Sequence, residues 1–248
     1  MSTLAEISYP LATLPSIADN LDDIDSRKAL PYLMAFMKNT FIRALNNVYQ
    51  AAPLIPKDPA IIRAFLDYIK CICALLQTHL DGDHLFFTST SCGVPLVKAI
   101  GPACNPDTLP IKDSLAQLTR VIVSWNENPR AYSPDVLRSA VGFGLRLARD
   151  MKAQLASLTF DRLSSAVSDK NLRDMIRDNV EWFAAKSDIT FLLPFVISHH
   201  DSSTSRHWPP IHDQGLQALP NLVQEHAGCW RFAPVDPLTR ERSHSWVC

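Results

Sequence analysis

The feature that most constrains this chain is a helical spacing of apolar residues, sustained over four long stretches. Apolar side chains return at every third or fourth position within residues 27–51, 59–79, 111–124 and 134–158. Because one helical turn takes 3.6 residues, this spacing gathers them on one face of each helix. Amphipathic helices of this length bury such faces against one another, so the sequence predicts an all-α helix bundle.

Prolines and capping residues mark the ends of these predicted helices. Asp58 and Ser133 each precede a proline at the first helical position, which is a strong start signal. The Asp81-Gly82 pair indicates either a break or a polar turn near the end of the second helix. Residues 86–110 hold four prolines and are predicted to be irregular. A fifth helix is predicted at about 170–185.

No internal repeat or linker divides the chain, so we expect one domain over 1–248. Its bundle core is expected at about 27–160, with an extra helix and a tail at about 168–248. From Ser198 onward the chain is polar and rich in proline. Aromatic residues in this tail predict that it packs back onto the bundle: Trp208, Trp230, Phe232 and Trp246.

Composition and motifs exclude several classes of protein. The 248 residues carry 24 basic and 25 acidic side chains, so neither a nucleic-acid partner nor an anionic membrane surface is expected. No apolar run approaches the ~20 residues of a membrane span, and the first twenty residues resemble no targeting signal, so we expect a soluble, cytoplasmic protein. The glycine-rich phosphate loops and the G-x-S-x-G and H-E-x-x-H signatures do not occur. The six cysteines include no C-x-x-C pair and are expected to be reduced structural thiols.

The informative anomaly is a set of polar residues on the faces that are predicted to be buried. Each of the four helices contributes one or two of them, near the same height in the bundle. Helix bundles build ligand and cofactor sites from side chains on facing helices, so we predict that these residues converge in the interior. They are Lys38, His79, Asp83, Lys112 and Asp150, with Thr108 and Gln154 one turn away from the last two.

Each of these positions also has a plainer interpretation. Lys38 can extend its aliphatic stem to reach solvent, and His79 can be a hydrogen-bonded core residue. Two lysines and two aspartates can also balance as a buried ion-pair network without chemistry. The fourth helix has a rival apolar stripe that would turn Asp150 outward: Leu137, Val141, Leu145, Ala148, Met151 and Leu155.

Several blocks of the sequence resemble a known family. The block Asn-Thr-Phe-Ile-Arg-Ala-Leu-Asn at 39–46 and the block Thr-His-Leu-Asp-Gly-Asp-His-Leu-Phe-Phe at 78–87 are similar to the first two helices of the hemerythrin-like, cation-binding proteins, in their long fungal branch. Residues 193–201, Trp208-Pro209 and 230–236 resemble the tail of that branch. The resemblance covers about residues 30–240 and implies an up-down four-helix bundle that holds two irons through histidines and carboxylates.

The residues at the family's metal positions depart from its pattern. Its first histidine corresponds to Lys38, and an ammonium repels a cation and offers no lone pair. The two irons are left with too few ligands, so we expect neither a metal nor another cofactor. The remaining correspondences pair the second helix with His79, Asp83, Leu80 and His84, the third with Thr108 and Lys112, and the fourth with Asp150 and Gln154.

A bundle that keeps its frame but loses its irons has a pocket with acid–base groups. Burial shifts the pKa values of lysine and carboxyl groups toward neutrality, which suits proton transfer. An apolar cavity with a few polar groups is the usual form of a small-molecule site. The walls are predicted to be Met34, Phe41, Phe65, Ile72, Leu115, Phe143 and Leu147, with the polar residues Thr108 and Gln154.

The leading hypothesis is a metal- and cofactor-independent isomerase, cyclase or lyase. The fungal branch is associated with secondary metabolism, so the resemblance implies a small apolar substrate such as a polyketide or terpenoid intermediate. Lys112 or Lys38 would bind or protonate a substrate oxygen, Asp83 or Asp150 would act as base or orienting group, and His79 would relay a proton. The alternatives are a non-catalytic small-molecule binding bundle and a residual hemerythrin-type protein that handles metal or oxygen.

Overall fold

The computed structural model describes residues 8–90, 93–204 and 207–243. These residues form helices and connecting segments, and their one β-type pairing is an isolated bridge between Val235 and Arg242, so the predicted all-α class is confirmed. The helices are α1 (Ser26–Ala51), α2 (Pro59–Thr88), α3 (Leu96–Ile100), α4 (Leu109–Glu127), α5 (Pro134–Ala140), α6 (Gly144–Ser157), α7 (Phe160–Ala166), α8 (Asp169–Lys186), α9 (Ile189–His199) and α10 (Asp213–Glu225).

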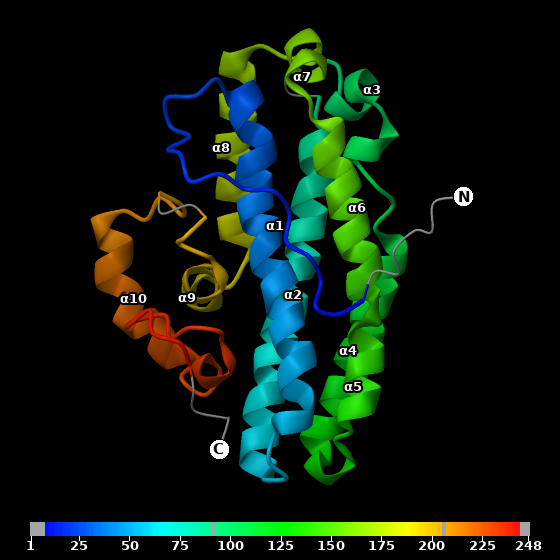
Figure 1. The fold of residues 1–248 in the computed structure, drawn as a ribbon, viewed down its shortest axis with the longest axis vertical. Coiled ribbons are helices and arrows are strands. Elements are labelled where there is room, and N and C mark those ends of the chain that lie inside the picture. The colour runs from blue at the N-terminus through cyan, green and yellow to red at the C-terminus, as the bar shows by residue number, and fades with distance from the viewer. Residues whose placement is uncertain (1–7, 91–92, 205–206, 244–248) are drawn as a thin grey trace.

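The long helices stand side by side and alternate in direction (Figure 1). In that view α1 descends, α2 returns, α4 descends again, and α5 with α6 returns to the top. α2 packs against α4 and α8, while α1 packs against α6, α8 and α9. The C-terminal part, with α9, α10 and the tail, lies along one flank of this helix bundle.

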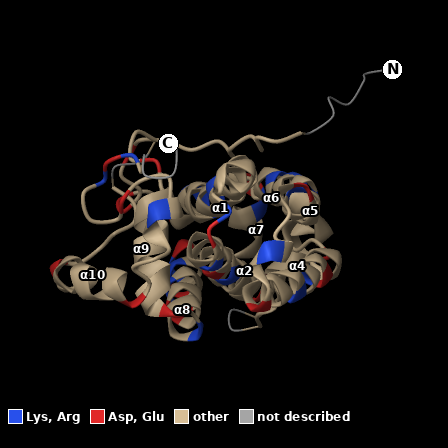
Figure 2. Cartoon of the chain, turned by 90° about the horizontal axis from the view of Figure 1, so that it is seen from below, with Lys and Arg blue, Asp and Glu red and all other residues tan. Residues whose placement is uncertain are grey.

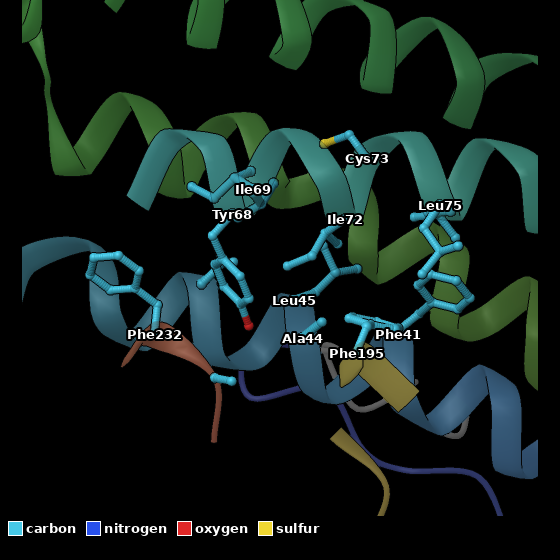
Figure 3. Packing of buried hydrophobic residues seen from close by; sticks show 14 of the residues in the cluster. Phe41, Ala44, Leu45, Tyr68, Ile69, Ile72, Cys73, Leu75, Phe195 and Phe232 are labelled. Atoms are coloured by element: carbon cyan, nitrogen blue, oxygen red, sulfur yellow. The ribbon is translucent and has the colours of Figure 1, made fainter. Parts of the chain in front are cut away.

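Part of the core lies where α1, α2 and α9 meet. Figure 3 shows Phe41 of α1 and Ile72 of α2 beside Phe195 of α9, with Phe232 of the tail further along. Phe41, Phe195 and Phe232 are completely buried, and each such side chain contributes about 1.5–3 kcal/mol through the loss of apolar surface from water. Phe232 therefore anchors the tail in the core. Trp230 is also buried, whereas Trp246 lies outside the described residues.

The interruption allowed for at Asp81-Gly82 does not occur, because α2 continues to Thr88. A β-carbon at Gly82 would lie 3.1 Å from the ring of Trp182 in α8, and the side chain of Asn179 donates a hydrogen bond to the Gly82 carbonyl at 2.9 Å. The glycine therefore serves the close approach of α8 to α2 and does not end the helix.

The fourth predicted helix is interrupted, in contrast to the continuous helix expected over 134–158. A 3₁₀ turn at Val141–Phe143 separates α5 from α6. The hydroxyl of Tyr9 donates to the Val141 carbonyl at 2.8 Å, so the N-terminal segment packs directly on the interruption. In α5 the rival stripe is the buried one, since Leu137 and Val141 are completely buried while Val136 is 49% exposed.

The sequence analysis missed four of the helices that the structure describes: α3, α7, α9 and α10. α10 lies within the part predicted to be a tail, although it spans 13 residues and buries Leu219 and Val223. α9 is apolar nearly all round and contains Pro194, because the bundle and α10 cover it from several sides. α3 and α7 span only one to two turns each, and α3 lies within the region predicted to be irregular. Periodicity over so few residues gives no reliable signal.

Charged residues are distributed over the outside of the molecule. Figure 2, viewed along the helices, shows basic and acidic positions next to one another on α4 and on α8. Of the helices that the structure describes, none combines the length and the hydrophobicity needed to cross a membrane.

Candidate acid–base site

Lys38 is the most unusual residue of the core. It lies in the middle of α1 with its side chain fully buried, so it does not extend to solvent. Its Nζ hydrogen-bonds His79 Nε2 at 3.2 Å and donates to the carboxylate of Asp83. Both partners come from α2, where a spacing of four residues places them on one face, one turn apart. The structure therefore brings together the first three residues of the predicted set.

The protonation states in this cluster follow from burial and from the neighbouring charges. Burial lowers the pKa of His79 to about 4, against the pull of Asp83 and in the same direction as the charge of Lys38. Burial raises the pKa of Asp83, but the charge of Lys38, aided by His79, outweighs it and holds that pKa below its usual range. At neutral pH the cluster is therefore a Lys38 ammonium, a neutral imidazole and a carboxylate. Because Lys38 donates to Nε2, we assign the imidazole proton to Nδ1.

Gln154 of α6 lies across the same cleft from α2 as a second buried polar residue. It lines the cleft together with Asp83 and donates from Nε2 to the Cys104 carbonyl at 2.8 Å. That bond restrains the Gln154 side chain, and the bond from Lys38 restrains the Asp83 carboxylate. Restrained rotamers are a precondition for a precise site.

Asp83 forms the boundary between this cluster and a narrow cleft. The cleft lies between α2, α4, α6 and the segment 105–108, and its volume is about 20 Å³, enough for one water molecule. Five of the sequence-predicted site residues share it: Asp83, Thr108, Leu147, Asp150 and Gln154. The other lining residues are Leu80, His84, Asn105, Pro106, Ile111 and Met151.

The cleft has two further ionisable groups at its wall. Asp150 accepts hydrogen bonds from Arg146 and Arg149, each at 3.3 Å, so its charge is balanced within α6. His84 Nδ1 lies 3.3 Å from the amide nitrogen of Asn105. Sequence reasoning did not predict His84 and Asn105 as site residues. His84 directly follows Asp83, but nothing in the local pattern of the proline-rich segment pointed to Asn105.

Lys112 does not join the cluster. Its Nζ lies 2.5 Å from Asp81 Oδ1, and the two side chains are 24% and 43% exposed. Asp81 and Asp83 are two residues apart and so point about 200° away from one another around α2. Lys112 therefore pairs with the outward-facing aspartate, whereas Lys38 pairs with the inward-facing one.

Most of the predicted apolar lining packs as solid core. Phe41, Phe65, Ile72, Leu115 and Leu147 all belong to the main buried cluster, and Phe143 is partly buried beside it. Met34 is partly buried beside a second, smaller cluster that contains Phe86 and Phe87. Of this set only Leu147 also lines the cleft. Phe41 has its ring 5.0 Å from that of His79, so it covers the imidazole. A larger groove of about 510 Å³ lies elsewhere, between the segment before α1, α1 itself and the start of α7, and no predicted site residue lines it.

A second buried polar pair was not foreseen. The Tyr68 hydroxyl and His199 Nε2 lie 2.6 Å apart, and His199 Nδ1 is 2.8 Å from the Phe195 carbonyl. Burial lowers the pKa of His199 to about 3, so its ring stays neutral. The pair links α2 to α9 inside the core. Neither of the two cavities described above is lined by Tyr68 or His199, so we interpret the pair as a packing element.

The residues at the cluster do not fit the two irons that the family resemblance implies. Lys38 stands where the resemblance would require a ligand, and its ammonium neutralises Asp83, which lies 3.8 Å from the one histidine of the cluster. Among the described residues, no three His, Cys, Asp or Glu side chains gather in a way that could hold a metal ion.

The arrangement supplies a carboxylate at the wall of a cleft, with an ammonium and a neutral imidazole behind it. Such a set can accept, donate and relay protons. In comparisons with known proteins, no family model, no curated protein and no solved structure matches this chain significantly.

Proposed function

We propose that the protein is a metal- and cofactor-independent enzyme that catalyses proton transfer on a small apolar substrate, as an isomerase, cyclase or lyase. The observation that carries this proposal is the position of Asp83, which faces the cleft and is backed by a fully buried lysine. Apolar residues of matched volume at these positions would fold at least as stably, because buried ion pairs are expensive to desolvate. The cluster is therefore better explained by chemistry than by stability.

The roles of the three residues follow from their charges. Asp83 accepts the proton of a C–H or O–H group in the cleft, and the cluster then changes from neutral to a single positive charge. The Lys38 ammonium lies behind Asp83 and does not line the cleft, so its positive charge offsets the negative charge that develops on the substrate without touching the substrate. His79 lies 3.2 Å from Lys38 Nζ and takes up or returns a proton as the reaction proceeds.

The low pKa of Asp83 narrows the class of substrate. A carboxylate with a depressed pKa is a weak base, so it deprotonates only an already acidic C–H group, such as one between two carbonyls. The apolar part of the cleft, with Leu80, Ile111 and Leu147, favours a substrate of low polarity. We therefore propose an apolar 1,3-dicarbonyl compound, a chemistry that matches polyketide intermediates.

Substrate entry requires the cleft to widen, since it now has room for one water. Two hydrogen bonds hold the segment 105–108 and its neighbour Cys104 against the bundle, one from Gln154 and one between Asn105 and His84. In this proposal the segment moves outward when substrate enters and closes over it afterwards.

We also propose that the bundle is a hemerythrin-like fold whose iron ligands have been replaced. The alternating direction of α1, α2, α4 and α5–α6 supports this relationship, as does the convergence of Lys38, His79 and Asp83, three residues that the resemblance aligns with ligand positions. The replacement of a ligand by Lys38 supports acid–base chemistry over a residual role with metal or oxygen.

The test uses benzoylacetone, an apolar 1,3-diketone, as a probe. After dilution from an apolar solvent into buffer, its enol relaxes to the keto form, and ultraviolet absorbance follows the rate. We expect the protein to accelerate this relaxation. The variant Lys38→Met/Asp83→Asn is expected to lose about 100-fold or more of the acceleration, the usual contribution of a positioned acid–base group.

The matched control removes the other lysine–aspartate pair of the same helix, Lys112→Met/Asp81→Asn, and is expected to keep its rate. Both double variants are neutral exchanges, so circular dichroism should show intact folds. The absence of any acceleration by the unmodified protein, or an equal effect of the two double variants, would refute the proposal and favour a non-catalytic bundle.

A further inference from the structure

A groove of about 510 Å³ lies beside the start of α1, and no residue of the acid–base cluster lines it. Its walls are the segment before α1, the first turns of α1 and the start of α7. The volume falls within the range of about 300–1,000 Å³ that is typical of small-molecule sites. Apolar side chains make up most of the lining: Ile17, Leu21, Ile24, Pro31, Leu158 and Phe160. The groove therefore favours a ligand that is largely apolar.

The groove follows a seam between two separate hydrophobic clusters. Leu21 packs with Phe36 in one cluster, whereas Leu158 belongs to the other. Arg173 of α8 fixes the wall formed by the segment before α1, because its Nη2 donates to the Ile24 carbonyl at 3.1 Å. The side chains of the two clusters leave the seam unfilled. An apolar ligand in the groove would therefore remove apolar surface of both walls from water.

Lys28 and Tyr32 bring two hydrogen-bond donors to this apolar lining. They are four residues apart on α1 and so share one face of the helix, and both line the groove. The Lys28 ammonium lies 5.1 Å from the centre of the Phe160 ring, a cation–π contact that holds it at the start of α7. In the described part of the chain, no carboxylate pairs with Lys28 and no acceptor receives the Tyr32 hydroxyl. A carboxylate, which only accepts hydrogen bonds, complements these two donors.

The charges beside the groove leave one positive charge unpaired. Arg27 bonds Asp25 through Nε at 2.9 Å and Nη2 at 2.5 Å, and Arg173 pairs with Asp169 at 3.1 Å. The first backbone N–H groups of α1 donate to the same two aspartates, so the helix terminus is already capped. The groove is not lined by the other aspartates of the segment before α1: Asp19, Asp22 and Asp23. The charge of Lys28 therefore matches a ligand with a single negative charge.

We propose that the groove binds an apolar monocarboxylate, such as a medium-chain fatty acid. The alkyl chain lies along the apolar walls, and the carboxylate accepts hydrogen bonds from Lys28 Nζ and the Tyr32 hydroxyl. This site is separate from the cleft at Asp83, so it does not depend on the function proposed for that cleft.

Isothermal titration calorimetry at pH 8 compares octanoate with octanol, which has the same chain length but no charge. We expect one octanoate to bind per chain, more tightly than octanol. Lys28→Met is expected to weaken octanoate binding about three- to five-fold and to leave octanol binding unchanged. Adding Tyr32→Phe should bring the loss for octanoate to about ten-fold and abolish the preference over octanol.

The matched control is Lys57→Met, an exposed lysine in the connection between α1 and α2, at the opposite end of α1 (Figure 1). This variant is expected to bind octanoate as the unmodified protein does. The proposal is overturned if octanoate does not bind, if octanol binds equally well, or if the variants at Lys28 and Lys57 have equal effects.

A photoreactive octanoate with a diazirine at the chain end locates the site in the unmodified protein. After irradiation, peptide mapping by mass spectrometry is expected to find adducts within residues 17–32 and 158–160. Adducts elsewhere, including those at the cleft beside Asp83, would overturn the proposal. This measurement decides the question even if a variant fails to fold, and its outcome is independent of the diketone assay.

Discussion

Replacement of Lys38 by methionine removes the buried ammonium while it keeps most of the side-chain volume. The Asp83 carboxylate then loses its charged partner. An uncompensated buried charge of this kind typically destabilises a protein by about 3–5 kcal/mol. Because the Asp83 side chain is 16% exposed, we expect the lower end of that range, about 3 kcal/mol.

A second substitution tests whether charge, and not packing, is responsible. Asp83→Asn in the Lys38→Met background removes the orphaned charge at nearly constant shape, so it should restore about 2 kcal/mol of the loss. The control Lys112→Met breaks a pair whose members are 24% and 43% exposed, and such surface pairs contribute about 0–1 kcal/mol.

Urea unfolding followed by circular dichroism measures these differences. With an m value of about 3 kcal/mol/M, reasonable for a chain of this size, Lys38→Met should lower the midpoint by about 1 M. The control should shift it by less than about 0.3 M. The reasoning is refuted if Lys38→Met is no more destabilising than Lys112→Met, or if the second substitution gives no recovery.

The other predictions concern acidity and close packing. His79 and His199 have folded pKa values of about 4 and about 3, below the ordinary 6.5, so the unfolded state alone takes up their protons as the pH falls below 6.5. The contribution of each neutral ring to the free energy of unfolding should therefore be full above pH 6.5. Below that pH the free energy of unfolding should fall by up to about 1.4 kcal/mol per pH unit for each ring. Urea midpoints measured at pH 7, 6 and 5 should decrease in that order, and equal midpoints would contradict this prediction. Gly144→Ala would place a β-carbon 2.3 Å from the Tyr9 hydroxyl. A β-carbon added at Gly142 would meet no atom within 4 Å. We expect a lower melting temperature for Gly144→Ala and only a small change for Gly142→Ala, and equal melting temperatures would argue against the packing of Tyr9 at this turn.

The local features of the helices were predictable from the sequence. Asp58 and Ser133 cap the helices that they precede, accepting hydrogen bonds from the backbone N–H groups of Ala60 and Val136. Capping residues and apolar periodicity involve only residues within one or two turns of one another. They can therefore be recognised from the amino-acid sequence alone. The same periodicity placed Lys38, His79 and Asp83 on inward faces, which is where the structure has them.

Only the tertiary structure decided which polar groups meet. Sequence spacing put Lys112 on the face of the third helix that packs inward, but the rotation of that helix against α2 gives it Asp81 and leaves Asp83 to Lys38. The interruption between α5 and α6 likewise depends on Tyr9, which lies 132 positions away from its acceptor Val141. In each case the outcome depends on the distance and rotation between segments remote in sequence, and those are set by the packing of the whole core rather than by neighbours along the chain.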